Sequence, residues 1–157
     1  MCKISVIGGA GFLGTRLCHM LDKGGFVFEI LDKKRSLAFP EKSVITDITD
    51  PTAIVASLSG ETVIHLAAVH TDNAPSSEYV KVNVDGTKNV IAACDSNGVK
   101  NIIFTSSVAV YGFAVPGTDE EAETNPYNDY GATKLQAEVL LRDWYQRSSD
   151  ERSLTII

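Results

Sequence analysis

The sequence has few cysteines, no long apolar run and no excess of positive charge. Its cysteines, Cys2, Cys18 and Cys94, are odd in number, scattered and without the spacing of metal ligands, so we expect reduced thiols and no metal site. No stretch approaches the roughly 18 apolar residues of a membrane span, and no signal peptide precedes the first apolar segment. These absences favour a cytoplasmic protein without a membrane segment.

Acidic residues outnumber basic ones, and the formal net charge is −6. This balance argues against binding to nucleic acid or to a membrane surface. One short basic run, Lys33–Arg35, is typical of a solvated loop. A hydrophobic content of 44% in 157 residues is that of an ordinary globular protein, and the length suits one domain.

Strand-like and helix-like segments alternate along the whole chain, without repeats or low-complexity tracts. The predicted strands are Ile4–Ile7, Phe26–Leu31, Val44–Ile45, Thr62–Leu66, Val99–Ser106 and Leu154–Ile157. The predicted helices are Phe12–Lys23, Pro51–Leu58, Ser77–Asn97 and Tyr130–Gln146. Asp50 is a predicted N-cap and Gly98 a predicted C-cap. Alternation of this kind predicts an α/β fold, a doubly wound parallel sheet with helices on both faces.

The glycines at 8, 11 and 14 are the most informative feature of the chain. They follow the apolar strand Ile4–Ile7 and lead into a predicted helix near Phe12. Gly8 allows a tight turn, Gly11 lets the backbone approach a pyrophosphate, and Gly14 lets the helix pack closely on the strand. A plain tight turn is the alternative interpretation, but the position of the cluster after a buried strand favours a Rossmann-type dinucleotide site.

An acid at the end of the second predicted strand adds to this interpretation. Asp32 can accept hydrogen bonds from both hydroxyls of an adenosine ribose, which favours NAD over a cofactor with a 2′-phosphate. The basic residues 33–35 that follow would tolerate such a phosphate, so NADP is the less favoured alternative.

A tyrosine and a lysine four residues apart, Tyr130 and Lys134, share one face of the last predicted helix. A neighbouring ammonium favours the phenolate form of tyrosine, which can take a proton from a substrate hydroxyl. Such pairs are common by chance on protein surfaces. Here, however, Thr105, Ser106 and Ser107 end the fifth predicted strand, at the edge where doubly wound sheets bind ligands. A hydroxyl there can bond the reacting oxygen, although serines can also simply end a strand.

Taken together, these motifs resemble the extended short-chain dehydrogenases/reductases, and in particular their nucleotide-sugar epimerase/dehydratase branch, typified by UDP-glucose 4-epimerases. The resemblance covers essentially all 157 residues. Besides the glycines, Asp32 and the Tyr130/Lys134 pair, the matching segments are Asp47-Ile48, His65-Leu66-Ala67-Ala68, Asn83-Val84-Asp85-Gly86-Thr87, Thr105-Ser106-Ser107 and Val110-Tyr111-Gly112.

The resemblance implies roles for individual residues. Tyr130 would be the catalytic base, assisted by Lys134. Ser107 would be the catalytic serine, since it stands five residues before Gly112, with Ser106 as the second choice. The implied NAD-contacting residues are Gly8, Gly11, Phe12, Leu13, Asp32, Asp47, Ile48, Leu66, Ala67, Ala68, Asn83, Tyr130 and Lys134. His70 would lie near the cofactor phosphates or the substrate, or else on a surface loop.

The sequence differs from the 4,6-dehydratases of this branch at the end of the fifth predicted strand. Its 4,6-dehydratases carry an Asp-Glu pair directly after the threonine of the fifth strand, whereas here Ser106 and Ser107 follow Thr105. The acidic run Asp119–Glu121 lies in a loop and is typical of a solvated segment. The resemblance therefore favours epimerisation or simple oxidoreduction over dehydration.

Three functions follow from these observations. The first is an NAD-dependent nucleotide-sugar epimerase, or its N-terminal domain, with a UDP-sugar as substrate and Tyr130 as base. The second is another NAD(P)-dependent reductase or dehydrogenase of the extended family. The third is a non-catalytic NAD-binding module. Family members have roughly twice this length, so residues 1–157 are expected to be the NAD-binding domain alone, truncated in the sixth strand and without a substrate domain.

The resemblance also implies a homodimer, in which the helices Ser77–Asn97 and Tyr130–Gln146 pair across a two-fold axis. Val82, Val90 and Leu140 lie off the main core stripes of these helices and are candidates for the dimer face. Packing in the core of the subunit is the equal alternative for these three side chains.

Overall fold

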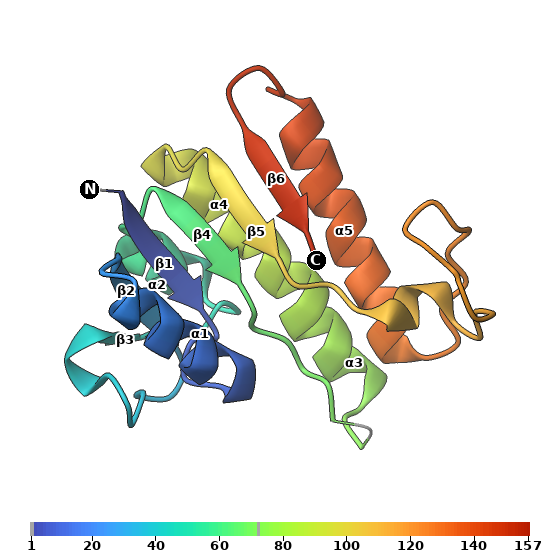
Figure 1. The fold of residues 1–157 in the computed structure, drawn as a ribbon, viewed down its shortest axis with the longest axis horizontal. Helices are drawn as coiled ribbons and strands as arrows, with labels where there is room; N and C mark the ends of the chain where they lie inside the picture. Colours follow the sequence, from blue (N-terminus) through green and yellow to red (C-terminus); the bar gives the residue numbers. More distant parts are fainter. Residues whose placement is uncertain (1, 72) are drawn as a thin grey trace.

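The computed structural model describes residues 2–71 and 73–157, which contain one six-stranded parallel sheet. The strand order is β3-β2-β1-β4-β5-β6, so the order reverses between β1 and β4 (Figure 1). The strands are β1 Lys3–Ile7, β2 Val27–Asp32, β3 Ser43–Ile45, β4 Thr62–His65, β5 Asn101–Phe104 and β6 Ser153–Ile156. All six predicted strands are confirmed, but β5 is shorter at both ends than the predicted Val99–Ser106.

The predicted helices are confirmed with one internal change. The helices are α1 Phe12–Lys23, α2 Pro51–Ser57, α3 Ser76–Tyr79, α4 Gly86–Asn97 and α5 Asp129–Gln146. Three short segments have other helical geometry: η1 Pro40–Lys42 and η3 Val108–Tyr111 are 3₁₀, and η2 Val80–Asp85 is a π-helix. Because α3, η2 and α4 are continuous, the predicted helix Ser77–Asn97 is one helix with a π segment inside it.

Two helix ends follow the predicted capping chemistry. The Asp50 carboxylate accepts the N–H groups of Thr52 and Ala53, both at 3.0 Å, and Pro51 occupies the first helical position of α2. Gly98 ends α4 in the left-handed conformation with φ of 69°.

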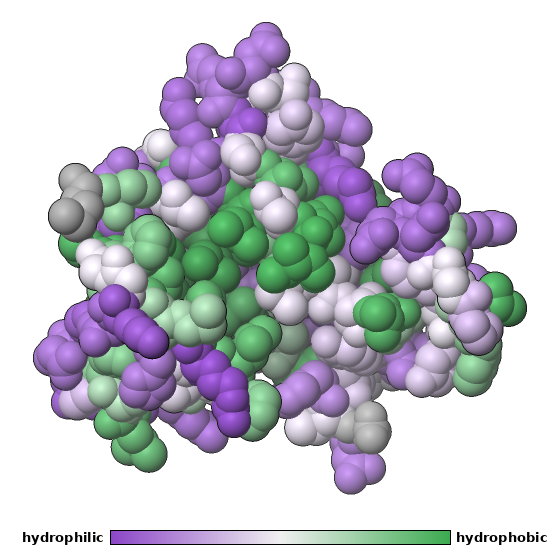
Figure 2. All heavy atoms as spheres, viewed as in Figure 1, coloured by the Kyte–Doolittle hydropathy of each residue, from purple (hydrophilic) through white to green (hydrophobic). Residues whose placement is uncertain are grey.

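Helices cover both faces of the sheet. On one face α1 packs against β1 and β2 through a cluster that includes Val6, Cys18 and Ile30. On the other face α2, α4 and α5 bury a larger cluster that includes Leu141 and Trp144. In Figure 1, α1 crosses in front of the sheet, and α4 lies behind β4 and β5. Figure 2 shows apolar side chains gathered in the middle of the same view.

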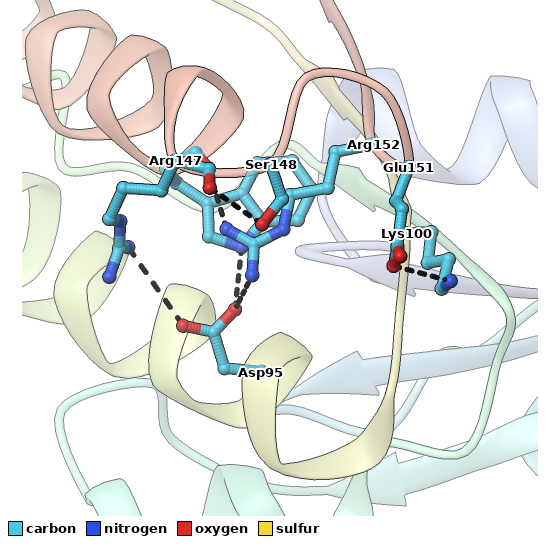
Figure 3. Close-up of polar contacts among 7 residues, drawn as sticks. Asp95, Lys100, Arg147, Ser148, Glu151 and Arg152 are labelled. Carbon is cyan, nitrogen blue, oxygen red and sulfur yellow. Dashed lines mark hydrogen bonds and ion pairs between the residues drawn. The ribbon is translucent and has the colours of Figure 1, made fainter.

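An ion-pair cluster fixes the edge strand β6 to α4 and α5 (Figure 3). Asp95 on α4 accepts a hydrogen bond from the indole Nε1 of the buried Trp144 at 2.7 Å. The same carboxylate contacts Arg152, at 3.0 Å, and Arg147, at 3.9 Å. Arg152 also stacks over the Trp144 ring, 4.6 Å from its centroid, and comes directly before β6. The cluster therefore joins the end of α5 to the start of β6.

The candidate dimer residues do not form an outward face. Val90 is fully buried in the core of the subunit, so it is not available to a partner. Val82 and Leu140 are partly buried and pack against that core. For Val90 the alternative, packing in the core of the subunit, is the one observed, because α4 packs against both α2 and α5 and Val90 belongs to their shared cluster.

Candidate dinucleotide and catalytic site

A cavity of about 400 Å³ opens at the carboxyl ends of the strands, with the ends of β1 and β2 and the segments that follow β1, β3 and β4 in its wall. This is the point where the strand order reverses and where doubly wound sheets bind ligands. Every predicted cofactor-contacting residue except Asn83 lies in the wall. The wall also includes Thr46, Val69, His70, Val82, Thr105 and Ser106.

The fold requires two of the three glycines of the β1–α1 turn, Gly8 and Gly14. Gly8 has φ of +83°, and a Cβ there would lie 2.6 Å from the amide nitrogen of Ala67. At Gly14 a Cβ would lie 2.5 Å from the carbonyl oxygen of Gly8, so α1 could not pack against the turn. At Gly11 a Cβ would meet a single protein atom, at 3.3 Å. The fold itself therefore does not require glycine at position 11.

Gly11 is also the N-cap of α1 and lies in the cavity wall. No side-chain hydrogen bond caps this helix end. Phe12 and Leu13, in the first turn of the helix, line the same cavity. N–H groups of a first helical turn attract negative charge, so this end of α1 suits a phosphate group.

The end of β2 forms the adjacent part of the wall. Asp32 is partly exposed to the cavity, and its carboxylate accepts backbone N–H groups from Ala10 at 3.1 Å and from Lys34 at 3.0 Å. These two bonds orient the carboxylate toward the glycine turn. They leave it acceptor capacity for further donors, because each oxygen has two lone pairs.

Thr46, Asp47 and Ile48 follow β3 and line the cavity next to β2. The buried hydroxyl of Thr46 has no hydrogen-bond partner among the described residues. Ile48 packs so closely on α4 that a Cβ at Gly86 would lie 2.6 Å from its Cδ1 atom. The backbone of this wall is therefore fixed from behind.

Tyr130 and Lys134, from the first turns of α5, close the opposite end of the cavity. Asn128 caps the helix by accepting the N–H of Gly131 at 2.8 Å. A Cβ at Gly131 would lie 2.4 Å from the carbonyl oxygen of Ala109, so α5 begins in close contact with η3. The cap and this contact determine where Tyr130 stands.

Lys134 is almost completely buried. Its Nζ donates to the carbonyl oxygen of Thr105 at 2.5 Å and lies 3.9 Å from the centroid of the Phe104 ring. Burial lowers the pKa of Lys134 from 10.5 to about 8, while the negative charge of Glu138 acts in the opposite direction. With that pKa, most of the side chain is an ammonium at pH 7.

His65 belongs to the core rather than to the cavity wall. It is 1% exposed, and its Nε2 atom lies 3.1 Å from the Thr87 hydroxyl. Burial, followed by the charge of Lys134, lowers the pKa of His65 from 6.5 to about 3, so the imidazole is neutral. The residues that follow it, Leu66–Ala68, do line the cavity.

The two candidate serines have different surroundings. Ser106 lies in the cavity wall, and its hydroxyl donates a hydrogen bond to Glu138. Ser107 is not part of the wall. Its Oγ accepts the N–H of Ala109 at 3.1 Å and caps η3. The hydroxyl of Ser106 is thus committed to Glu138, whereas that of Ser107 accepts a hydrogen bond and keeps its own proton to donate.

Asn83 supports the site from behind. It is 2% exposed and is not among the residues that line the cavity. Its amide bonds both the N–H of Val69, at 2.8 Å, and the carbonyl oxygen of Val69, at 3.1 Å. The same amide donates to the Thr133 hydroxyl on α5 at 3.1 Å. Asn83 therefore joins the loop after β4 to the helix that carries Tyr130.

Sequence reasoning did not find Thr46 or Glu138. Thr46 directly precedes the matched pair Asp47-Ile48, and Glu138 follows Lys134 by one helical turn. This closeness to predicted site residues was the sequence signal that could have indicated both. Across residues 2–71 and 73–157, no three His, Cys, Asp or Glu side chains group as a metal site. No helix in the same ranges is long and apolar enough to cross a membrane.

The sheet, the glycine turn and the acid at the end of β2 define a dinucleotide-binding α/β protein of the Rossmann type. Residues 4–155 match the model of the NAD dependent epimerase/dehydratase family, and the chain belongs to that family.

Three proteins similar to this chain have different named activities. An N-acetyl-alpha-D-glucosaminyl-diphospho-ditrans,octacis-undecaprenol 4-epimerase of Escherichia coli O157:H7 is 49% identical over 99% of this chain and 47% of its own length. A D-erythronate dehydrogenase of Cupriavidus necator is 31% identical, over 92% of this chain and 51% of its own. The structure of UDP-glucose 4-epimerase from Brucella ovis in complex with NAD has 30% identity and a TM-score of 0.89, covering 99% of this chain and 51% of that one. The chain thus spans about half the length of these relatives, and the predicted fold is confirmed.

Proposed function

We propose that residues 1–157 are the NAD-binding domain of an NAD-dependent 4-epimerase that acts on a diphosphate-activated sugar. One observation carries the proposal: Tyr130 and Lys134 line the same cavity as Gly11 and Asp32. In this arrangement a proton-transfer pair would share one space with the bound dinucleotide.

The residues of the cavity fit NAD. The open Cβ position at Gly11 and the uncapped start of α1 would hold the pyrophosphate. Asp32 would accept the hydroxyls of the adenosine ribose, which favours NAD over NADP. Asp47 and Ile48 would flank the adenine, Leu66–Ala68 would line the middle of the cofactor, and Asn83 would act from behind. When bound, NAD would supply a reversible acceptor for the hydride at C4 of the sugar.

The catalytic residues would act on the 4-hydroxyl of the sugar. Tyr130, as phenolate, would take the hydroxyl proton, because the ammonium of Lys134 stabilises the negative phenolate oxygen. Ser107 would donate a hydrogen bond to the same sugar oxygen. Ser106 is the second choice, because its hydroxyl is already bonded to Glu138. Return of the hydride to the opposite face of C4, and of the proton from Tyr130 to the 4-oxygen, would complete the inversion.

The two epimerases among these relatives are both named for a diphosphate-linked sugar, but the group that carries the diphosphate differs. The Brucella ovis protein is named for a UDP-sugar and the Escherichia coli protein for a lipid-linked one. We favour a UDP-sugar. The 49% identity to the second protein makes the lipid-linked sugar the specific competing substrate.

The decisive experiment incubates NAD and the whole protein to which residues 1–157 belong with UDP-glucose, UDP-N-acetylglucosamine or N-acetylglucosaminyl-diphospho-undecaprenol, and follows the C4 epimers by NMR. Inversion with one of them that Tyr130→Phe abolishes supports the proposal. NAD binding with net oxidation of a different hydroxyl compound would favour a dehydrogenase like the Cupriavidus relative. NAD binding with no turnover would favour the non-catalytic module.

Quaternary state and compartment belong to the same proposal. Val80, the first residue of η2, is 41% exposed, and Val139 on α5 is 52% exposed. These two valines replace Val90 as candidates for a dimer face. Cys2, Cys18 and Cys94 are all free thiols, which suits the cytoplasm. Analytical ultracentrifugation of the protein and of Val139→Glu tests the homodimer.

A further inference from the structure

Glu138 is a buried acid that the proposed mechanism does not use. It lies on α5 one helical turn after Lys134, and its side chain is 9% exposed. One carboxylate oxygen accepts the hydroxyl of Ser106, and the other lies 3.3 Å from Arg142. An acid with so little access to water is unfavourable unless its contacts stabilise the charge.

Two neighbouring residues at the end of β5 bond two successive turns of α5. The carbonyl oxygen of Thr105 accepts from Lys134, and the hydroxyl of Ser106 donates to Glu138. The bonds run in opposite directions, since Lys134 is a donor and Glu138 an acceptor. Together they fix the end of β5, including the backbone before Ser107, against the helix that carries Tyr130.

The surroundings of Lys134 contain few charges. His65 on β4 is neutral, and Phe104 and Thr105 on β5 offer a ring face and a carbonyl oxygen. On α5 itself, Tyr130 precedes Lys134 by one turn and Glu138 follows it. Glu138 is therefore the negative charge that balances the buried ammonium, and it is the charge that opposes the effect of burial on Lys134.

On the basis of the function proposed above, we propose that Glu138 is a positioning residue that keeps Lys134 in its ammonium form and holds Ser106 away from the substrate oxygen. Glu138 acts through these two residues and does not itself touch the substrate. Loss of its charge would neutralise Lys134 at a lower pH and would weaken stabilisation of the phenolate at Tyr130.

The test separates charge from hydrogen bonding with two variants. Glu138→Gln still accepts the Ser106 hydroxyl but has no charge, whereas Glu138→Asp keeps the charge on a shorter side chain. Arg142→Gln is the matched control, because it removes the exposed partner of Glu138 and leaves Ser106 and Lys134 in place. Each protein is checked for folding by circular dichroism.

The first readout is the pKa of Lys134, measured by NMR of lysine labelled with ¹³C at Cε and assigned with Lys134→Met. It needs neither substrate nor cofactor, so it tests Glu138 even if the epimerase proposal fails. We expect a pKa lower by about 1 in Glu138→Gln, the effect of losing one nearby opposite charge, and no change in Arg142→Gln. An unchanged value in a folded Glu138→Gln would overturn the inference.

If Glu138→Gln does not fold, Glu138→Asp decides, because it retains the charge. A Lys134 pKa equal to that of the parent protein supports the inference, and a value lowered by about 1 contradicts it.

The second readout is the pH profile of kcat/KM. Its basic limb should move to lower pH in Glu138→Gln alone, whereas a purely structural role would lower activity equally at every pH.

Discussion

Alanine at Gly14 should lower the stability of the fold, whereas alanine at Gly11 should weaken the binding of NAD. At Gly14 the new methyl would lie 2.5 Å from both Gly8 O and Gly9 Cα, which is much closer than an ordinary van der Waals contact of 3.4–4 Å. Alanine favours a helix by about 1 kcal/mol over glycine, but overpacking against backbone typically costs more. Gly14→Ala should therefore lower the free energy of unfolding by about 1–3 kcal/mol.

Gly11→Ala should change the stability little and the affinity for NAD strongly. The backbone there has φ of −77°, which alanine adopts, and the single close atom is 3.3 Å away. The loss of stability should stay below about 1 kcal/mol, because alanine is only a poorer N-cap than glycine. The methyl would occupy the space where the pyrophosphate approaches. The dissociation constant for NAD should rise at least tenfold, or about 1.4 kcal/mol.

Urea unfolding and calorimetric titration with NAD measure the two effects. Gly25→Ala is the control, since its φ of 73° strains the backbone while no atom lies within 4 Å of the new Cβ. It should lose stability and keep its NAD affinity. Unchanged NAD affinity in a folded Gly11→Ala would refute the assignment of this turn to the pyrophosphate.

Three further predictions follow from contacts elsewhere. Asp95→Ala should lower the free energy of unfolding by about 2 kcal/mol in urea titrations, because the Nε1 of the buried Trp144 loses its acceptor; an unchanged urea midpoint would contradict this. Folding lowers the pKa of His65 from 6.5 to about 3, so protonation in this range favours the unfolded chain. Stability should therefore be complete above pH 6.5 and fall below it, by up to about 1.4 kcal/mol per pH unit, and parallel profiles of the parent and His65→Gln would exclude that contribution. Asp32→Ala should weaken NAD more than NADP in calorimetry, narrowing their affinity ratio about tenfold, and an unchanged ratio would remove Asp32 from cofactor selection.

Local chemistry explains why the fold could be predicted from the sequence. The Asp50-Pro51 start of α2 and the Gly98 end of α4 are decided by hydrogen bonds and backbone angles within a few residues, and both predictions are confirmed. The alternation of strands and helices limits the sheet to parallel topologies. What could not be predicted is the π segment at 80–85, which packs against α5, an element distant in the sequence.

The site shows the same division between local and long-range information. The conformation of the glycine turn depends on residues within the turn itself, so it could be predicted locally. The resemblance to the family assigned the catalytic roles of Tyr130 and Lys134. The resemblance implied that Asn83 contacts the cofactor and helps hold the geometry of the site; the partners of its amide, Val69 and Thr133, could not be predicted because they are distant in sequence. Glu138 was missed because its bond to Ser106 spans 32 residues. Contacts of this kind are visible only once the chain is folded.

The most direct test of the proposed 4-epimerisation uses a sugar substrate that carries deuterium at C4. With NAD and the whole protein that contains residues 1–157, the account predicts that both C4 epimers form and retain the label, and that Tyr130→Phe prevents redistribution of the label between them. Exchange of the label with solvent hydrogen, or inversion at full rate in Tyr130→Phe, would contradict it.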